Sequence, residues 1–380
     1  MKPIYLDYNA TTPIDPEVIS AMRPYLEEHF GNPSSAHAYG LVARRAVEEA
    51  RSQVAGLLHC MADEILFTGG GSESNNHALK GAAFAHRERG NHIVTSNVEH
   101  PAVTEVCTWL AGHGFEVTYV PVDAYGRVSV ADIEKAMRPE TVLVSIMHAN
   151  NEIGTVQPIA EIARVARSKG ALIHTDAAQS AGKIPVNIDD LGVDLLSIAG
   201  HKLYAPKGIG ALYIRRGVRI EKFIHGAGQE SGRRAGTENV LEVVGLGKAC
   251  EVAHRDMARN VAHMGEMREA LKSRLRERVP EMRVNGHPVE RLPNTLSVSF
   301  RGVDAGAVLD EIGDRMAASA GAACHSGTVA ISHVLRAIGI SKEWARGTLR
   351  LSTGRGTTAE QTQAAADAIA DAVAICRGRG

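Results

Sequence analysis

Short apolar runs alternate along most of the chain with segments whose apolar residues recur at helical spacing. Apolar runs of about four to eight residues fit strands that are buried on both faces. They occupy residues 64–68, 92–96, 116–120, 141–147 and 172–175. The segments between them predict helices over 73–88, 102–111, 130–137 and 159–168. Repeated βα units of this kind predict an α/β fold with a mostly parallel sheet covered by helices on both faces.

The remaining segments add long helices and a second group of strands. Asp15 and Pro16 predict a helix start, because aspartate is a favoured N-cap and proline suits the first helical position. We expect an amphipathic helix over 36–58 and a further helix from 240 to 253 that continues to 279. Strands are expected at 194–199, 210–214 and 295–300, and a last helix at 359–375. A chain of 380 residues suits two domains.

Composition narrows the possible partners. The formal net charge is -1, so no basic field favours nucleic acid or an acidic membrane surface. No apolar run approaches the roughly 18 residues that span a bilayer. The first residues show no signal-peptide core, and we expect a cytoplasmic protein.

The cysteines and histidines argue against a metal site. Five cysteines are scattered without a C-x-x-C pair, which fits a reducing compartment and leaves room for one catalytic thiol. The seventeen histidines show no H-E-x-x-H spacing. We therefore expect no metal. Four of the cysteines lie in helical patterns and are expected to be structural: Cys60, Cys107, Cys250 and Cys376.

Two strand ends carry candidate chemistry. The strand at 172–175 ends in Asp176, and the run at 194–199 ends just before His201 and Lys202. A single lysine is usually a solvated surface residue, but here it follows a buried strand near a buried acid. Such a pair is what a pyridoxal-phosphate enzyme needs, because the lysine binds the cofactor and the acid keeps its pyridine nitrogen protonated.

A glycine-rich turn at 69–74 lies between a predicted strand and helix. Its glycines allow the backbone to approach an anion, and Ser72 can donate to it at the helix N-terminus. The turn matches neither G-x-G-x-x-G nor G-x-x-x-x-G-K-[ST], which argues against a dinucleotide or nucleotide site.

Nine motifs in order make the chain resemble a cysteine desulfurase of the aminotransferase class-V, fold-type-I pyridoxal-phosphate family. They are Tyr5 to Pro13, Gly31 to Ser35, Glu99-His100, His148 to Gly154, Asp176 to Gln179, His201-Lys202, Gly236-Thr237, Cys324 and Arg355. The resemblance implies a large domain over 15–255 that binds pyridoxal 5'-phosphate. It also implies a smaller α+β domain, formed by 1–14 and 256–380, that carries the catalytic cysteine.

The resemblance also assigns roles in cofactor binding. Gly71, Ser72 and His201 are expected at the phosphate, which Thr237 of a second subunit also reaches. The other expected contacts are His100 stacking on the ring, Asn151 and Gln179 near its phenolic oxygen and the substrate, Asp176 at the pyridine nitrogen and Lys202 as the covalent attachment. Asn32 and Thr237 match residues that reach across the interface in the family, so the resemblance also implies a homodimer with composite active sites.

One position departs from the family pattern. Relatives usually carry a phosphate-binding serine three residues before the lysine, where this chain has Ala199. Ser197 points the same way along a strand, but it lies about 6–7 Å away. We expect one phosphate hydrogen bond fewer.

Cys324 and Arg355 complete the expected site. The resemblance assigns Arg355 to the substrate α-carboxylate, which a planar guanidinium matches, whereas Arg350 is expected to be structural or an ion-pair partner. Cys324 precedes His325 and a polar stretch with Gly327, which predicts a flexible loop suited to carrying sulfur away. By itself, a cysteine of this kind is more often a small buried hydrophobe.

The reaction implied by the resemblance converts L-cysteine to L-alanine and leaves a persulfide on Cys324. The sulfur then passes to an acceptor protein, for which an iron–sulfur scaffold, a tRNA-thiolation protein or a DNA-modification protein all fit. Because Ala-Ala-Cys-His-Ser is closer to selenocysteine lyases, that activity is the first alternative. A non-catalytic binding or assembly partner is the second, and Ala199 is the one feature that favours it.

Overall fold

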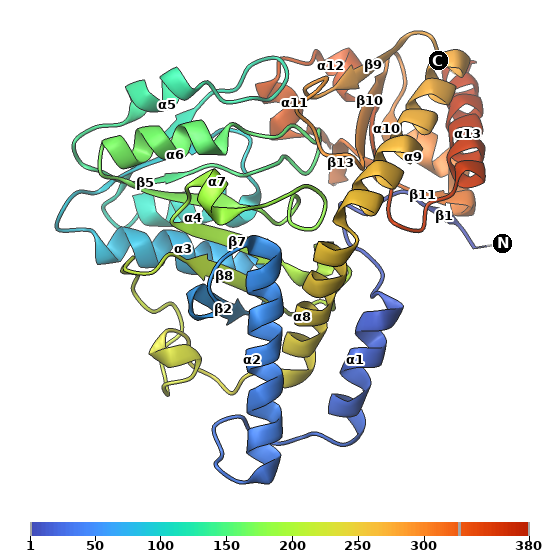
Figure 1. Cartoon of the computed structure of the whole chain (residues 1–380). Coiled ribbons are helices and arrows are strands. Elements are labelled where there is room, and N and C mark those ends of the chain that lie inside the picture. Colours follow the sequence, from blue (N-terminus) through green and yellow to red (C-terminus); the bar gives the residue numbers. More distant parts are fainter. Residues whose placement is uncertain (1, 326–327, 379–380) are drawn as a thin grey trace.

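A seven-stranded sheet forms the centre of the larger part of the molecule (Figure 1). The computed structural model describes residues 2–325 and 328–378. The strand order is β2-β8-β7-β6-β5-β3-β4, and β8 runs antiparallel to both of its neighbours. The strands are β2 (Ile65–Thr68), β3 (His92–Ser96), β4 (Glu116–Val120), β5 (Thr141–Ser145), β6 (Leu172–Asp176), β7 (Leu195–Ala199) and β8 (Gly210–Ile214). The predicted α/β class with a mostly parallel sheet is confirmed.

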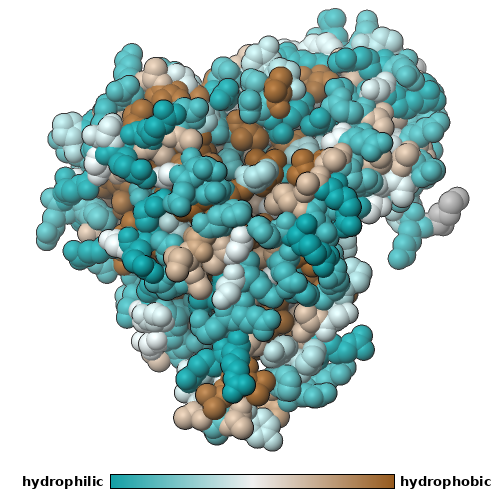
Figure 2. Space-filling view, in the orientation of Figure 1, coloured by the Kyte–Doolittle hydropathy of each residue, from teal (hydrophilic) through white to brown (hydrophobic). Residues whose placement is uncertain are grey.

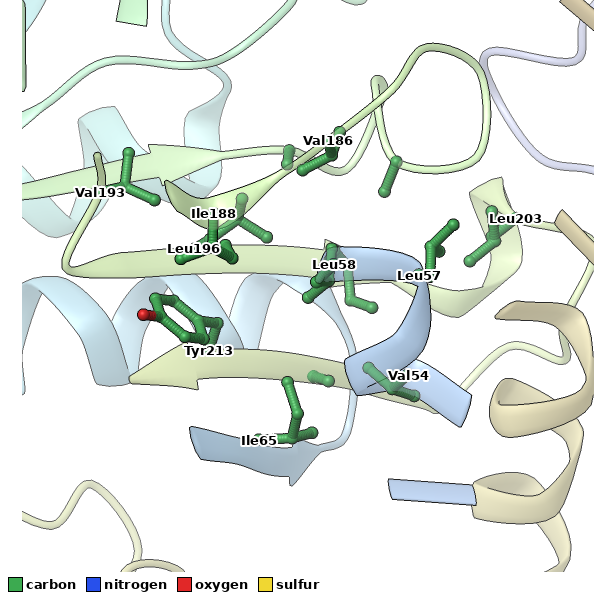
Figure 3. Close-up of a cluster of buried hydrophobic side chains, with 14 of the residues drawn as sticks. Val54, Leu57, Leu58, Ile65, Val186, Ile188, Val193, Leu196, Leu203 and Tyr213 are labelled. Carbon is green, nitrogen blue, oxygen red and sulfur yellow. The ribbon is translucent and has the colours of Figure 1, made fainter. Parts of the chain in front are cut away.

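Helices cover both faces of this sheet, as the βα pattern predicts. Alternate strand residues point to opposite faces, so Ile65 and Phe67 belong to one buried cluster and Leu66 to another. Residues of α3 (Gly71–Ala85) and α4 (Pro101–Ala111) belong to the same cluster as Leu66. The opposite cluster includes residues of α2 (Ala38–Leu58), α5 (Val130–Ala136), α6 (Ile159–Ser168), α7 (Ile188–Leu191) and α8 (Val240–Arg255). Figure 3 shows part of it, including Leu57 and Leu58 of α2, Leu196 of β7 and Tyr213 of β8.

Two long helices connect the sheet to the C-terminal part of the chain. The expectation of one helix from 240 to 279 is wrong, because α8 ends at Arg255 and α9 (Met257–Arg278) begins after Asp256. Asp256 has φ -103° and ψ 10°, which breaks the regular helical geometry between them. Residues of α8 belong to the core around the large sheet, whereas α9 contributes Leu271 and Leu275 to a separate core.

That second core lies against an antiparallel sheet of order β12-β15-β10-β9. Its strands are β9 (Met282–Asn285), β10 (Thr295–Phe300), β12 (Ser319–Ala320) and β15 (Thr348–Ser352). The packed helices include α9, α10 (Ala305–Ile312) and α13 (Ala359–Gly378). Leu6 belongs to the same core, and β1 (Ile4–Tyr5) pairs in parallel with β11 (Met316–Ala317), beside the C-terminal elements in Figure 1. The boundaries of the two expected domains stay a prediction.

The segment around Cys324 forms a hairpin. β13 (Ala322–His325) pairs antiparallel with β14 (Thr328–Ile331), and Cys324 lies opposite Val329. The backbone is therefore extended in both strands of the segment where the sequence predicts a flexible loop. Two short helices follow, α11 (His333–Ala337) and α12 (Lys342–Ala345). Within the described residues, no helix combines the length and apolar character required to cross a bilayer.

Candidate active site

A cavity of about 660 Å³ opens at the carboxyl end of the large sheet. Asp176 is the last residue of β6, and Lys202 lies in the single turn of 3-10 helix that follows β7. Both line the cavity together with the first residues of α3. In α/β sheets, ligands bind at the carboxyl ends of the strands, so this is the position where the fold is expected to bind one.

Lys202 brings a reactive amine into this cavity. Its Nζ donates to the carbonyl oxygen of Ala10 at 2.7 Å and also to that of Asn9. Burial, together with the charge of Arg350, lowers the pKa of Lys202 to about 8. A substantial fraction of the amine is therefore neutral near neutral pH, as a nucleophile or proton acceptor requires.

Asp176 is held as a buried hydrogen-bond acceptor. Its Oδ2 accepts from Asn75 Nδ2 at 2.7 Å, and its Oδ1 accepts from the backbone amide of Ala178 at 2.9 Å. Asn75 is neutral, so it orients the carboxylate without pairing with its charge. The charge of Asp176 stays available for a protonated ring nitrogen in the cavity.

The N-terminus of α3 forms the phosphate end of the cavity. Gly70 has a φ of 137°, a conformation that favours glycine, and it leads into a helix whose first residues are Gly71 and Ser72. A β-carbon on Gly71 would lie 3.1 Å from the β-carbon of Ala199. The glycine thus leaves space beside the free amides of the helix end, which favour an anion.

Ala199 lines the cavity as the sequence predicts, and the nearby serine does not replace it. Ser197 Oγ lies 3.0 Å from His174 Nε2 and is fully buried on the same strand. Its hydroxyl is therefore committed to the interior of the sheet.

Two histidines border the cavity. His100 caps α4, because its Nδ1 accepts from the backbone amide of Ala102 at 3.1 Å, and its side chain also lines the cavity. Burial lowers its pKa, which keeps Nδ1 unprotonated as the cap requires. His201 lies with Nδ1 3.2 Å from Thr11 Oγ1, and burial lowers its pKa to about 4. It therefore offers a neutral ring to a ligand.

Two amide side chains complete the lining of the cavity near Lys202. Gln179 and Asn151 both line the cavity. Gln179 Nε2 donates at 2.9 Å to the carbonyl oxygen of Asn9, which also accepts from Lys202. Asn9 Nδ2 in turn donates to the carbonyl oxygen of Asn151 at 3.1 Å. Asn9 thereby connects three of the expected site residues.

The structure brings Arg350, and not Arg355, to the cavity. Arg350 lies within β15 and lines the cavity, where its Nη2 donates to Asp7 Oδ1 and Ser319 Oγ, each at 2.9 Å. The Arg355 guanidinium lies over the ring of Tyr204, 4.3 Å from its centroid, and its Nη1 is 3.5 Å from Asp15 Oδ2. Arg355 is not among the residues that line the cavity.

Thr237 and Cys324 are the two remaining residues that are expected at the site. Thr237 is exposed and does not line the cavity. The backbone of Cys324 is described as part of β13, but its side chain lies outside the described residues. Within the part of the chain that the structure describes, no group of three or more His, Cys, Asp or Glu residues could hold a metal ion.

The residues present fit pyridoxal phosphate. The cavity offers a helix N-terminus for a phosphate, a carboxylate for a pyridine nitrogen and an amine for an aldehyde, contributed by Gly71, Asp176 and Lys202. Sequence reasoning missed three residues that line this cavity: Asn9, Asn75 and Arg350. Asn9 lies inside a motif already noted, and Asn75 lies one helical turn beyond Gly71, so both carried a weak signal.

Comparison with known proteins agrees with this chemistry. The family described as aminotransferase class-V matches residues 4–364. A cysteine desulfurase IscS of Dictyoglomus turgidum is 48% identical over 367 residues, which cover 96% of this chain and 93% of that protein. A solved NifS-like protein superposes with a TM-score of 0.93 at 38% identity, covering 99% of this chain and 100% of that one. A structure described as SspA in complex with cysteine gives a TM-score of 0.79 at 38% identity, and the match covers 93% of this chain and 99% of that one.

These matches extend over nearly the whole chain and include the elements that form the cavity. The chain therefore belongs to the aminotransferase class-V family, among its pyridoxal-phosphate-dependent cysteine desulfurases.

Proposed function

We propose that this cysteine desulfurase converts L-cysteine to L-alanine and transfers the sulfur to Cys324. The observation that carries the proposal is the position of Lys202, whose amine, with a pKa lowered to about 8, shares a cavity with Asp176 and Arg350. Relatives named cysteine desulfurase support the substrate, as does the structure described as SspA in complex with cysteine.

The chain's own residues would hold the cofactor as follows. The amides at the start of α3 and the Ser72 hydroxyl would bind the phosphate, with His201 beside them. Asp176 would bind the pyridine nitrogen, and His100 would border the ring. Bound pyridoxal phosphate supplies an electron sink that stabilises negative charge at the substrate Cα.

Lys202 would act as the base of the reaction. Its Nζ lies in the cavity and would accept the Cα proton of the bound substrate. The carbonyl oxygens of Asn9 and Ala10 hold the amine in the cavity and bind the protonated form. A pKa near 8 lets Nζ take up this proton and later return it at neutral pH.

Arg350 binds the substrate carboxylate. Its Nη2 is held by Asp7 and Ser319, whereas its Nη1 makes only a 3.5 Å contact with the carbonyl oxygen of Asn151. The side chain is therefore fixed in direction and keeps a donor for an incoming carboxylate. The geometry favours it over Arg355, the residue expected from the sequence.

Cys324 accepts the sulfur. Its thiolate attacks the substrate Sγ, an S–S bond forms, and the Cβ–Sγ bond breaks with its electron pair remaining on carbon. Protonation of that carbon gives alanine, and the enzyme retains a persulfide. A sulfur-acceptor protein then takes up the outer sulfur, and an iron–sulfur scaffold is the partner we propose.

The active enzyme is a cytoplasmic homodimer in this proposal. Exposed apolar side chains gather around the loop between α1 (Pro16–Glu27) and α2, at the lower tip of the molecule in Figure 2. Phe30 and Tyr39 are 83% and 60% exposed, with their rings stacked 5.3 Å apart. Monomeric surfaces seldom expose such a patch, so it suits a contact with a second copy. Thr237, which is exposed, would reach the active site of the second copy.

One observation favours a second candidate function. Cys324 is followed by His325 in Ala-Ala-Cys-His-Ser, the sequence that resembles selenocysteine lyases. The same cavity would accept L-selenocysteine, since its α-carboxylate and amine are identical to those of cysteine.

Product analysis of the native enzyme and Lys202→Ala tests the proposed function. The native enzyme should release alanine from L-cysteine and carry the visible absorbance of bound cofactor, whereas Lys202→Ala should lose both. If the native enzyme releases alanine from L-selenocysteine but not from L-cysteine, the selenocysteine lyase function would be established. An unchanged spectrum in Lys202→Ala would contradict the assignment of the lysine.

A further inference from the structure

Lys183 is a second lysine close to the cavity, and the proposed reaction does not use it. It is 3% exposed, and its Nζ donates to Gln179 Oε1 at 2.8 Å and to Asn9 Oδ1 at 3.2 Å. Within the described residues, no carboxylate lies within ion-pair distance of it, and burial lowers its pKa well below the ordinary value. Burying an unpaired amine costs free energy, so this position calls for a function.

The two contacts of Lys183 determine how both amides are oriented. A lysine amine in these bonds only donates, so it requires the oxygen, and not the nitrogen, of each amide to face it. Gln179 Oε1 therefore points toward Lys183, and Nε2 points to the carbonyl oxygen of Asn9 at 2.9 Å. A rotated Gln179 amide would lose the hydrogen bond that the Lys183 amine donates to Oε1, and it would place Oε1 against the carbonyl oxygen of Asn9.

The orientation decides what Gln179 can do in the cavity. Its Nε2 donates to the same carbonyl oxygen of Asn9 that accepts from Lys202. Gln179 thus presents N–H groups on the side where Lys202 attaches the cofactor, and an anionic oxygen there requires donors. With its oxygen on that side, the same side chain would repel the ligand.

We propose that Lys183 is a positioning residue that holds Gln179 with its amide N–H toward the cavity, so that Gln179 donates to an oxygen of bound pyridoxal phosphate. The proposal rests on the cofactor-binding role proposed for Gln179. It differs from a purely structural role, in which Lys183 would only connect the N-terminal segment at Asn9 to the large sheet.

A double-mutant cycle separates the two roles. The variants are Lys183→Met, which keeps the length of the side chain without its donors, Gln179→Met and the double variant. The readout is the dissociation constant for pyridoxal phosphate, measured by titrating the full-length apo-protein and recording the cofactor absorbance. Loss of one hydrogen bond corresponds to a weakening of about threefold to tenfold. Lys183→Met should weaken cofactor binding by this factor when Gln179 is present. In the Gln179→Met variant, adding Lys183→Met should weaken binding little further.

Equal losses in the two backgrounds, or no loss in Lys183→Met, would overturn the proposal. Lys169→Met is the matched control, because Lys169 is an exposed lysine whose Nζ donates to the Glu134 carbonyl oxygen at 2.7 Å, and it does not line the cavity. Its cofactor affinity should equal that of the native chain. Thermal unfolding of each apo-protein shows whether the variant is folded.

Gln179→Glu provides an independent test if Lys183→Met does not fold. The new carboxylate would pair with Lys183 and leave no N–H toward the cavity, so the apo-protein should unfold at a higher temperature while binding the cofactor more weakly. Native affinity in Gln179→Glu would overturn the proposal. Because all these measurements use cofactor affinity, failure of the desulfurase reaction itself would leave their outcome unchanged.

Discussion

Replacing Arg350 with glutamine is the most informative test of substrate recognition. Arg350 Nη2 is held at 2.9 Å from both Asp7 Oδ1 and Ser319 Oγ, and the side chain lies at the cavity with Lys202. Glutamine removes the charge and shortens the reach. A hydrogen bond to a charged group is worth about 1.5–3 kcal/mol, which corresponds to a rise in KM of about tenfold to 150-fold.

The assay measures alanine release over a range of L-cysteine concentrations, with the bound cofactor quantified by absorbance in the same samples. Full cofactor occupancy would show that the cavity is intact in the variant. Arg355→Gln is the matched control, because it removes a second arginine five positions away whose guanidinium lies over Tyr204. Its KM should stay native, although loss of the contacts with Tyr204 and Asp15 should lower its stability.

The opposite pattern would refute this reasoning. A raised KM in Arg355→Gln with a native KM in Arg350→Gln would return carboxylate binding to Arg355. It would also mean that the substrate reaches a region outside the cavity that contains Lys202.

Three further predictions concern the cofactor, pH and assembly. Ala199→Ser should tighten pyridoxal-phosphate binding by about 0.5–1.5 kcal/mol, and equal dissociation constants would show that the added hydroxyl meets no phosphate acceptor. Burial raises the pKa of Glu99 to about 8, so the folded chain binds this proton more tightly than the unfolded chain, and the associated stability is lost as the pH rises toward and past 8. The free energy of unfolding of apo Glu99→Gln, measured with urea, should therefore decline less between about pH 5 and 9 than that of the native chain. Parallel pH profiles would contradict the raised pKa of Glu99. Analytical ultracentrifugation should show an active dimer that Phe30→Asp weakens, and a fully active monomer would exclude composite active sites.

The alternation of strands and helices was readable from the sequence because parallel strands buried on both faces must be apolar throughout. The segments at 92–96, 116–120 and 210–214 coincide with β3, β4 and β8. The direction of β8 was not predictable, since an apolar strand looks the same in either orientation. The helix break at Asp256 was also missed, because apolar spacing continues across it and one residue's dihedral angles leave no compositional signal.

The site was predicted where single residues carry recognisable chemistry. Asp176, Lys202 and the turn at Gly71 meet in one cavity, as strand ends in this fold require. The contacts of Lys183 were not predictable, because its bond to Asn9 joins residues that are 174 positions apart. Arg350 and Arg355 could not be ranked by residue type alone, because only the geometry of β15 shows which guanidinium faces the cavity.

The central claim of this account is that Cys324 receives the sulfur of L-cysteine. Mass spectrometry of the native enzyme after one turnover should show one added sulfur atom on the peptide that contains Cys324, together with an equal amount of alanine. Cys324→Ala should retain the cofactor absorbance and release no alanine from L-cysteine, while keeping much of any activity on L-selenocysteine, because selenium is the better leaving atom. Substantial alanine release from L-cysteine by Cys324→Ala would contradict the account.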